Sequence, residues 1–431
     1  MARLGSDVAD PALAGVGRAR IEWADAQMPV LASIRERFDS ERPLAGVGVA
    51  ACLHVTAETA NLALTLMAGG AEVSLCAANP LSTQDDTAAG LADLGATVLG
   101  SRGEDPDAYA AHVGALVAAE PQVTIDDGAD LITVLHATRP DLARGLLGAT
   151  EETTTGLVRL RALEAAGRLA CPVMAVNEAA TERAFNDRFG TGQSTLDGIL
   201  RATHLLLAGH TVVVLGYGWT GKGVALRARG AGASVIVCEV DPMPALEARM
   251  EGFEVMPVLD AAPRGDVFVT VTGVRDVLRA EHMQRMKDGA ILANAGHFDV
   301  EISLADLGGL ALGPPREVRP LVDQYDLGDH RRLNLLARGR LVNLAAAEGH
   351  PAAVMDMSFA IQALCVEDLV RHVGTRGPGV IAVPEAIDRE VARLKLAALG
   401  VSIDTLSADQ ADYRHRWEQS SPVARSGSGD R

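Results

Sequence analysis

The chain alternates short apolar runs with longer stretches in which apolar residues recur at helical spacing. Apolar runs of about four to eight residues, bounded by glycine or polar residues, are typical of buried strands. They predict one series of strands at residues 46–53, 72–77, 97–99, 122–125, 131–135 and 171–176. A second series is predicted at residues 212–215, 234–238, 267–270, 290–293 and 341–343.

Between these runs, apolar residues lie three and four positions apart, which predicts amphipathic helices. Residues 7–40 place Trp23, Met28, Leu31 and Ile34 on one side of a helix. Further helices are predicted at residues 56–67, 83–94, 351–372 and 384–399, and a long one begins near residue 194. Strands that alternate with helices in this way indicate open parallel sheets covered by helices.

Residues 211–241 have the pattern of a dinucleotide-binding turn. Gly216, Gly218 and Gly221 follow an apolar run and begin a helical stretch, so the backbone can turn tightly and approach a pyrophosphate at the helix N-terminus. A second apolar run ends at Glu239, about twenty residues later, where a carboxylate can bind a ribose 2′-hydroxyl group. An acidic residue at this place favours NAD over NADP. An ordinary glycine-rich turn is the weaker alternative, because strand, helix and terminal acid are all present.

The length of 431 residues is too great for one hydrophobic core, and the two series of strands predict two domains. The predicted fold class is α/β, with two Rossmann-like doubly wound domains and a short C-terminal helical tail. Residues 1–188 together with 351–385 form the predicted substrate-binding domain, and residues 189–350 form the predicted NAD-binding domain. The segment 386–431 ends in a polar stretch rich in serine and glycine, so we expect disorder from about residue 420.

Composition narrows the range of partners and compartments. A formal net charge of −17 argues against nucleic acid and anionic membranes as partners. The five cysteines lie far apart without a C-x-x-C pair, which predicts buried thiols in a reducing compartment, neither disulfides nor zinc ligands, and no metal site. The sequence shows no signal peptide and no apolar stretch of membrane-spanning length, so we expect a soluble cytoplasmic protein.

Polar residues cluster directly after several predicted strands, where ligands of open α/β sheets bind. Each cluster alone is more often a turn, a helix cap or a satisfied histidine. Their recurrence at strand ends, in a chain with a dinucleotide turn, predicts one shared site. The clusters are CLHVTAET with His54, Thr56 and Glu58; IDDGAD with Asp126 and Asp127; EETTTG with Glu152; NAGHFD with Asn294 and His297; and EGHP with His350.

Several of these clusters belong to long and uncommon strings. The strings include PLAGVGVAACLHVTAETA, STQDD, IDDGAD, EETTTG, FGTGQSTLDGILRAT, GYGWTGKG, ANAGHFDVEI and GRLVNLAAAEGHPAAVMDMSFA. Through them the chain resembles the S-adenosylhomocysteine hydrolases over nearly its whole length. It is most similar to the shorter bacterial and archaeal branch, which also lacks the C-terminal Lys/Tyr arm of the longer enzymes.

The resemblance implies a redox cycle on an adenine nucleoside, with one tightly bound NAD per subunit and a homotetrameric assembly. In the family, NAD takes hydride from the 3′ carbon of the ribose, and the resulting ketone acidifies the 4′ C–H. A base removes that proton, the 5′ substituent leaves by β-elimination, water adds, and the hydride returns. The protein positions the cofactor and supplies the acids and bases.

The matching motifs also imply roles for individual residues. His54 and Asp127 should serve the 4′ proton and the 5′ leaving group, and Glu152 should reach ribose hydroxyl groups. The implied catalytic residues are His54, Asp127, Glu152, Glu182, Asn186 and His297. The implied substrate-binding residues are Thr56, Glu58, Thr153, Asn177, His350 and Met355. The implied cofactor-binding residues are Thr153, Thr154, Thr155, Gly216, Gly218, Trp219, Thr220, Gly221, Glu239, Thr272, Gly273, Asn294, Gly296, His297 and Asn343.

One segment departs from the family pattern at the carbon that is oxidised. The family reads N-D-x-x-T-K-x-x-F-D-N, whereas this chain has Glu182 in place of the lysine and Asn186 in place of the aspartate that follows the phenylalanine. In the family these positions, four apart on one helix face, address the 3′-hydroxyl group. A carboxylate at 182 can still accept the 3′ proton, particularly if burial raises its pKa. Arg183 or Asp187 could act as replacements, but on a helix we expect both to point elsewhere.

Three functions are compatible with these residues. We favour an active NAD enzyme moved to a related nucleoside, namely a nucleoside 5′-dehydratase that forms a 4′,5′-unsaturated nucleoside in nucleoside-antibiotic biosynthesis. The alternative is an ordinary S-adenosyl-L-homocysteine hydrolase that tolerates the two substitutions. A non-catalytic homologue that binds NAD or a nucleoside is the third, and the presence of His54, Asp127, Glu152, His297 and His350 counts against it.

Overall fold

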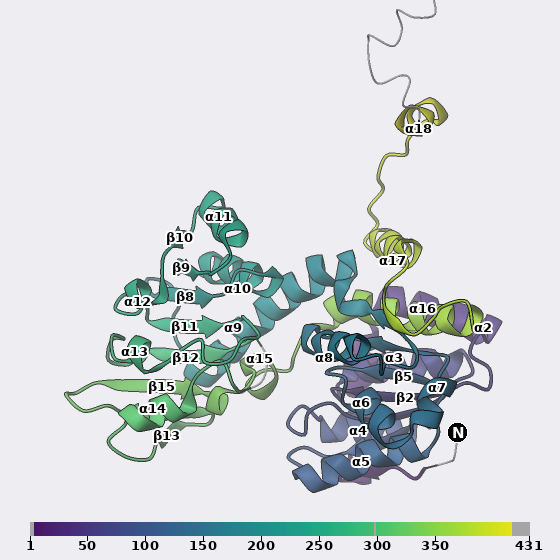
Figure 1. Ribbon diagram of the computed structural model, residues 1–431, viewed down its shortest axis with the longest axis horizontal. Helices are drawn as coiled ribbons and strands as arrows, with labels where there is room; N and C mark the ends of the chain where they lie inside the picture. The colour runs from purple at the N-terminus through teal and green to yellow at the C-terminus, as the bar shows by residue number, and fades with distance from the viewer. Residues whose placement is uncertain (1–3, 297–298, 416–431) are drawn as a thin grey trace, which may run out of the picture.

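The computed structural model describes residues 4–296 and 299–415, and it contains two α/β bodies that lie side by side (Figure 1). Within the described residues, each body is built on an eight-stranded sheet. Across the first sheet the strands are β1 (Asp7–Val8), β4 (Thr97–Gly100), β3 (Glu72–Ala77), β2 (Gly48–Leu53), β5 (Val123–Asp126), β6 (Gly148–Glu151), β7 (Pro172–Ala175) and β16 (Gly379–Ala382). Across the second they are β10 (Glu254–Val255), β9 (Ser234–Cys238), β8 (Thr211–Leu215), β11 (Val267–Thr270), β12 (Ile291–Asn294), β15 (Arg332–Leu336), β14 (Val322–Asp326) and β13 (Arg316–Arg319). The predicted α/β fold class with two Rossmann-like sheets is confirmed.

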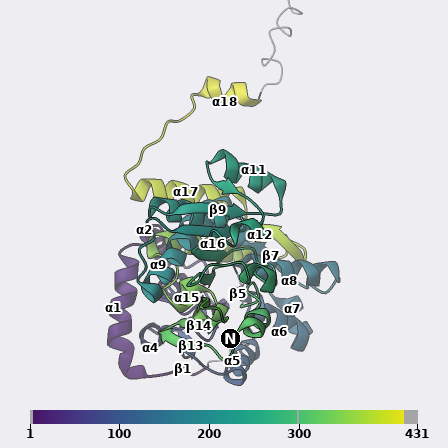
Figure 2. The ribbon, with the colours of Figure 1, turned by 90° about the vertical axis from the view of Figure 1, so that its left-hand side faces the viewer.

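Helices cover both sheets, and a C-terminal segment extends away from the two bodies to α18 (Figures 1 and 2). Among the described helices, none combines the length and apolarity needed to span a bilayer. The helices near the first sheet are α1 (Ala14–Asp25), α2 (Pro29–Glu41), α3 (Ala57–Ala68), α4 (Asp85–Asp93), α5 (Pro106–Ala118), α6 (Asp130–Thr138), α7 (Pro140–Gly145), α8 (Thr154–Ala165), α16 (Ala352–Arg371) and α17 (Glu385–Ala398). The others are α9 (Gly192–Thr203), α10 (Trp219–Gly230), α11 (Pro242–Met250), α12 (Val258–Ala261), α13 (Ala280–Met283), α14 (Leu304–Leu310), α15 (Val342–Ala345) and α18 (Ala408–His415).

The first sheet is parallel, and its strand order reverses between β2 and β5. The chain runs from β2 outward through β3 to β4, and then returns to place β5, β6 and β7 on the other side of β2. Cys52 near the end of β2 is aligned with Asp126 at the end of β5. The residues that follow these strands therefore emerge at a switch point, where open α/β sheets bind ligands.

The second sheet has the same kind of switch point between β8 and β11. Leu215 at the end of β8 is aligned with Thr270 at the end of β11, so Gly216 and Val271 leave the sheet next to each other. The pairing of β14 with both β13 and β15 is antiparallel and closes the far edge of this sheet. The dinucleotide turn predicted from the sequence thus lies at the carboxyl edge of the second sheet.

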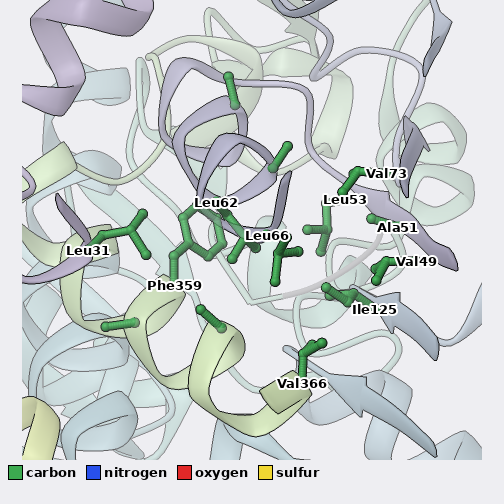
Figure 3. Close-up of a cluster of buried hydrophobic side chains, with 14 of the residues drawn as sticks. Leu31, Val49, Ala51, Leu53, Leu62, Leu66, Val73, Ile125, Phe359 and Val366 are labelled. Atoms are coloured by element: carbon green, nitrogen blue, oxygen red, sulfur yellow. The ribbon is translucent and has the colours of Figure 1, made fainter. Parts of the chain in front are cut away.

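The core of the first body joins segments from the beginning and the end of the chain. Leu62 and Leu66 of α3 pack with Phe359 and Val366 of α16 on the face of the sheet (Figure 3). All four side chains are buried, and burial of each contributes about 1.5–3 kcal/mol to folding. Because α16 follows the second body in sequence, this packing carries the chain back and fixes α16 beside the first sheet.

Two predicted strands are wrong. Residues 131–135 belong to helix α6, and the carboxylate of Asp126 accepts hydrogen bonds from the backbone N–H groups of Leu131 and Ile132 at the start of that helix. A short apolar run does not distinguish a strand from a buried helix, and here this cap selects the helix. Residues 341–343 make only one bridge, between Leu341 and Asn294, before α15 begins, and the strand beside β12 is β15.

The helix predicted over residues 7–40 is broken into α1 and α2. Pro29 begins α2, where its fixed φ angle and missing N–H group are tolerated. Met28, Leu31 and Ile34 are buried as predicted, but Trp23 is 74% exposed. Trp23 of α1 and the buried residues of α2 therefore lie on two separate helices and do not form the single apolar face that the sequence predicts.

Two glycines let helix α10 pack with its backbone against the start of α9 and the segment that precedes α9. A Cβ atom on Gly223 of α10 would lie 1.7 Å from the carbonyl oxygen of Arg188. A Cβ atom on Gly192 would lie 2.5 Å from the carbonyl carbon of Gly223. Arg188 belongs to the segment Glu182–Thr191 that leads into α9. The helix after the dinucleotide turn therefore contacts the segment that carries residues 182 and 186.

This contact predicts that Gly223→Ala is destabilising. The added methyl group overlaps backbone atoms, so we expect the free energy of unfolding to fall by about 1–3 kcal/mol in denaturant titrations of the protein as purified. Gly230→Ala at the end of the same helix is the matched control, because its Cβ atom would meet nothing within 4 Å. Equal free energies of unfolding for the two variants would show that the stability of the protein does not depend on this contact.

Candidate active site

The carboxyl edges of both sheets open into one cavity of about 1090 Å³. The first body contributes residues that follow β2, β5 and β6, including His54, Asp127 and Glu152. The second body contributes Gly218 of the dinucleotide turn and Thr272 after β11. A cavity of this size can hold a dinucleotide end and a second small ligand next to each other.

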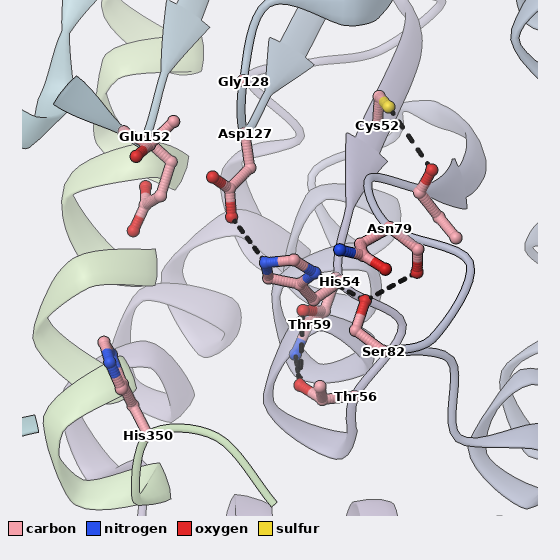
Figure 4. A network of polar contacts seen from close by, with 12 residues as sticks. Cys52, His54, Thr56, Thr59, Asn79, Ser82, Asp127, Gly128, Glu152 and His350 are labelled. Carbon is pink, nitrogen blue, oxygen red and sulfur yellow. Dashed lines mark hydrogen bonds and ion pairs between the residues drawn. The ribbon is translucent and has the colours of Figure 1, made fainter. Parts of the chain in front are cut away.

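His54 lies at the switch point of the first sheet, between Asp127 and Ser82 (Figure 4). Its Nε2 atom is 3.3 Å from Asp127 Oδ2, and its Nδ1 atom is 2.6 Å from Ser82 Oγ. The Ser82 hydroxyl group also lies 2.8 Å from the carbonyl oxygen of Asn79. These contacts orient the imidazole ring, and a carboxylate beside it can stabilise a proton on Nε2.

Four further predicted residues surround the part of the cavity near the start of α3 and α16. Thr56 accepts a hydrogen bond from the Thr59 N–H group and caps α3, and burial raises the pKa of Glu58 in the first turn of that helix. His350 Nε2 is 3.0 Å from Thr191 Oγ1. Burial, with a smaller effect of His54, lowers the pKa of His350 to about 4, so this ring is neutral at pH 7. Met355 also lines the cavity.

Glu152 is held by two side chains of α16 that the sequence did not suggest. Ser358 Oγ donates a hydrogen bond to Glu152 Oε1, and Gln362 Nε2 donates one to Glu152 Oε2. Burial raises the pKa of Glu152 to about 7 in spite of these donors. The available signal was the spacing of Ser358 and Gln362, four apart in the apolar stretch that follows Asp356 in α16, which places both on one face.

Glu182 and Asn186 are buried next to Glu152 and line the same cavity. Asn186 Nδ2 donates a hydrogen bond to Glu182 Oε1 and lies 3.5 Å from Ser358 Oγ. Burial raises the pKa of Glu182 well above its usual value, and the charges of Glu152 and Asp187 raise it further. The two residues that depart from the family pattern are thus brought together with Glu152 and Ser358.

Arg183 and Asp187 also line the cavity, so the expectation that both point elsewhere is wrong. The segment Glu182–Thr191 is a π-helix, in which residues five apart share a face. Asp187 therefore lies close enough to Glu182 to act on its pKa, and burial raises the pKa of Asp187 itself to about 7. The π-helix thus places the carboxyl group of Asp187 in the cavity together with those of Glu152 and Glu182.

The dinucleotide turn has the backbone geometry that its glycines require. Gly216 has a φ angle of +103°, and a Cβ atom on Gly221 would lie 2.1 Å from the Gly216 carbonyl oxygen. Gly218, Trp219 and Thr220 line the cavity at the N-terminus of α10. Glu239 accepts hydrogen bonds from the N–H groups of Tyr217, Val240 and Asp241. Gly216, Gly221 and Glu239 shape the turn but do not line the cavity.

A buried carboxylate, Glu301, holds the loop after β11. It accepts hydrogen bonds from the Thr272 and Gly273 N–H groups at 3.1 and 2.6 Å, and a Cβ atom on Gly296 would lie 2.0 Å from its Oε1 atom. Thr272, Gly273 and Gly296 all line the cavity. Glu301 is therefore a positioning residue, and its place in the string ANAGHFDVEI was the only sequence signal.

The remaining predicted residues fall into three groups. Thr153, Thr154, Thr155, Asn177 and Asn343 line the cavity, and Thr154 Oγ1 donates a hydrogen bond of 2.7 Å to Asn177 Oδ1. Asn294 lies outside the cavity wall, where it accepts a hydrogen bond from the Gly296 N–H group. His297 lies outside the described residues.

The five cysteines lie outside the lining of this cavity. All five cysteines are buried free thiols, as predicted. Over residues 4–296 and 299–415, no group of three histidine, cysteine or acidic side chains is arranged to hold a metal ion.

Gly221→Ala tests the turn directly. Overlap with the Gly216 carbonyl group costs about 1–3 kcal/mol, and about 1.4 kcal/mol corresponds to a tenfold loss of affinity. We expect the dinucleotide released from denatured protein to fall about tenfold or more relative to the native chain, while Gly230→Ala keeps its content. Full occupancy of the Gly221→Ala protein would contradict this account of the turn.

Both parts of the chain match known protein families. The family "S-adenosyl-L-homocysteine hydrolase" matches residues 6–144, and "S-adenosyl-L-homocysteine hydrolase, NAD binding domain" matches residues 187–349. The second match includes the dinucleotide turn and the loop after β11. NAD is therefore the cofactor, as the turn and Glu239 predicted.

Relatives with curated names extend the likeness over nearly the whole chain. Adenosylhomocysteinase of Gloeobacter violaceus is 56% identical over 94% of this chain and 95% of its own length. Adenosylhomocysteinase of Aquifex aeolicus is 59% identical over 96% of this chain and 99% of its own length. S-inosyl-L-homocysteine hydrolase of Methanopyrus kandleri is 52% identical over 96% of this chain and 97% of its own length. The chain therefore belongs to the S-adenosyl-L-homocysteine hydrolase family of enzymes.

Proposed function

We propose that the protein oxidises the sugar of an adenine nucleoside at its 3′ carbon, removes the 4′ proton and eliminates the 5′ substituent. The supporting observation is that one cavity contains the NAD turn, the His54–Asp127 pair and a group of buried carboxyl side chains. Bound NAD supplies the hydride acceptor for the oxidation and returns the hydride at the end of the cycle.

The residues around the cavity suggest how NAD and the nucleoside are held. Gly218, Trp219 and Thr220 at the N-terminus of α10 suit the pyrophosphate, because N–H groups at a helix start favour anions. We assign Glu239, directly after β9, to the ribose hydroxyl groups of NAD because of its spacing from the glycine turn, and we assign Thr272 and Gly273, which line the cavity, to the nicotinamide end. We assign Thr56, Glu58, His350 and Met355 to the adenine of the substrate, as the family resemblance implies.

The His54–Asp127 pair is suited to the proton at the 4′ carbon. Nε2 of His54 faces Asp127 at 3.3 Å, and Ser82 holds the opposite nitrogen. In this proposal His54 takes the 4′ proton and later gives a proton to the 5′ leaving group, while Asp127 stabilises the charged ring. Glu152, Glu182 and Asn186 then lie beside the oxidised hydroxyl group.

We propose further that the 5′ group that leaves is a hydroxyl group. The nucleoside then loses one water and gives a 4′,5′-unsaturated nucleoside, and the enzyme is a 5′-dehydratase of nucleoside natural-product biosynthesis. The pair Glu182–Asn186 carries this proposal, because it changes the groups that face the oxidised carbon while leaving the elimination residues in place. A relative named S-inosyl-L-homocysteine hydrolase at 52% identity supports the view that the nucleoside can change at this level of similarity.

Hydrolysis of S-adenosyl-L-homocysteine is the second candidate. It is favoured by the names of the relatives at 56% and 59% identity, both called adenosylhomocysteinase. This candidate requires Glu182 and Asn186 to replace lysine and aspartate without changing the substrate. A binding protein without catalysis is least favoured, because His54 and Asp127 keep a geometry that binding alone does not need.

Product masses distinguish the candidates. The NAD-loaded protein is incubated with adenine nucleosides and, separately, with S-adenosyl-L-homocysteine. We expect loss of one water from a free nucleoside, with no homocysteine formed. Formation of adenosine and homocysteine would contradict the dehydratase proposal, and no turnover with unchanged NAD absorbance on any nucleoside would contradict both enzyme proposals.

The double variant Glu182→Lys, Asn186→Asp tests whether the pair determines the reaction. It restores the family pattern, so we expect homocysteine to form from S-adenosyl-L-homocysteine at a rate at least about tenfold above the detection limit that the native chain does not exceed, a change of about 1.4 kcal/mol or more in the barrier. The single variants Glu182→Lys and Asn186→Asp are the matched controls. If the double variant gains no hydrolysis and keeps the dehydration, the divergence lies elsewhere in the cavity.

A further inference from the structure

The sugar end of the cavity presents two buried oxygen atoms that lack a hydrogen-bond donor. Glu182 is 1% exposed and Asn186 is 6% exposed, and both line the cavity. The Asn186 amide group donates to Glu182 Oε1. Within the described part of the chain, Glu182 Oε2 and Asn186 Oδ1 have no hydrogen-bond partner. An ionised carboxylate buried with so few donors is costly, so a neutral Glu182 is favoured.

Both oxygen atoms of Glu152 accept hydrogen bonds from side chains, unlike those of Glu182. Ser358 and Gln362 donate to its two oxygen atoms, and donors to a carboxylate favour its charged form. The Ser358 hydroxyl group also lies 3.5 Å from the Asn186 amide nitrogen, so the two carboxyl groups share one hydrogen-bonded cluster. When only one of them is ionised, the pattern of donors places the charge on Glu152 and the proton on Glu182.

The neighbouring groups reinforce this division. Burial is the largest effect that raises the pKa of both Glu152 and Glu182. The carboxylates of Asp127 and Asp187 raise the pKa of Glu152 further, and those of Glu152 and Asp187 raise the pKa of Glu182 against smaller effects of the Asn186 and Ser358 hydrogen bonds. The guanidinium group of Arg183 lowers the pKa of Asp187, but its Nη2 atom is also 3.2 Å from Glu178 Oε1. His350 is neutral because its pKa is lowered to about 4. None of these groups supplies a positive charge that would ionise Glu182.

We propose that Glu182 works as a neutral carboxylic acid that donates a hydrogen bond to the 3′ oxygen of the sugar, while Glu152 accepts the proton that this oxygen loses on oxidation. The inference rests on the proposed 3′ oxidation and holds for either leaving group. In the oxidation, the hydroxyl O–H bond breaks, an O–H bond forms on Glu152, and the hydrogen of C3′ passes to NAD as hydride. Glu182 keeps its own proton throughout.

A neutral donor at this place has a chemical use in the next step. Removal of the 4′ proton builds negative charge on the 3′ oxygen of the ketone, and a donor aimed at that oxygen stabilises the charge. A carboxyl group kept neutral by its surroundings can be such a donor at neutral pH. The replacement of lysine by glutamate therefore preserves a hydrogen-bond donor and does not place a second negative charge beside the oxidised carbon.

The variants Glu182→Gln and Glu182→Ala test whether Glu182 acts as a hydrogen-bond donor or as a base. Glutamine keeps an N–H donor at the same length, so we expect turnover within about tenfold of the native chain, whereas alanine should lose about 100-fold, as for removal of one donor to an oxyanion. The reduction of bound NAD on addition of adenosine provides a second readout of the oxidation. If Glu182→Gln is as impaired as Glu182→Ala in both readouts, Glu182 acts as a base and the proposal is wrong.

The dependence of activity on pH distinguishes the proposed role of Glu182 from a purely structural one. Activity should rise as Glu152 ionises near pH 7 and fall at higher pH as Glu182 loses its proton. In Glu182→Gln the high-pH decrease should disappear, because the amide group does not ionise in that range. Persistence of the same decrease in Glu182→Gln would assign it to another group and overturn the role given to Glu182.

Infrared difference spectra test the protonation without turnover. At pH 7 the NAD-loaded native protein should show the carbonyl band of a protonated carboxyl group that Glu182→Gln lacks and Asp187→Asn retains. A missing band, or one lost only in Asp187→Asn, would overturn the proposal even if the enzyme is active. A protein that turns over no nucleoside but shows the band would instead contradict the proposed function, so the two failures are distinguishable.

Discussion

Two buried carboxyl groups, Glu152 and Glu182, and a half-buried third, Asp187, line one end of the cavity, and the proposed chemistry depends on how they share charge. Burial raises the pKa of Glu152, Glu182 and Asp187, and the charge of Asp187 raises the pKa of Glu152 and Glu182 further, so ionisation of all three together is disfavoured. Ser358 and Gln362 donate to the two oxygen atoms of Glu152, which is why the proposal places the charge on this group. In the role proposed for Glu182, a substitution that looks like a reversal of charge in the sequence exchanges one hydrogen-bond donor for another.

The fold places these groups by bringing distant segments of the chain together. Strands β5 and β6 deliver Asp127 and Glu152 to the carboxyl edge of the first sheet, and α16 returns from the end of the second body to supply Ser358 and Gln362. The π-helix that carries Glu182 is fixed on its other side by the backbone contact with Gly223 of α10. The NAD turn and the sugar site are therefore parts of one packed unit, and a shift in α10 should move both.

Much of this arrangement was predictable from the sequence, for identifiable reasons. The strands at 72–77 and 267–270 and the turn at Gly216 follow from apolar runs and glycine spacing, which report local backbone geometry directly. Residues 131–135 were assigned to a strand because a short apolar run carries no information about the cap that Asp126 provides. Likewise, the role of Ser358 depends on where α16 packs, and the position of Asp187 depends on a π-helix that helical spacing of 3.6 residues does not reveal. Such features are set by tertiary contacts, which no local pattern specifies.

Neutron diffraction from crystals of the NAD-loaded protein with a bound adenine nucleoside, grown near pH 7 in deuterated solvent, tests the central claim most directly. The account predicts deuterium on Glu182 Oε2, directed at the 3′ oxygen of the sugar, and none on the oxygen atoms of Glu152 before oxidation. Deuterium on Glu152 with a bare carboxylate at Glu182 would contradict it, because the two residues would then hold the opposite charges.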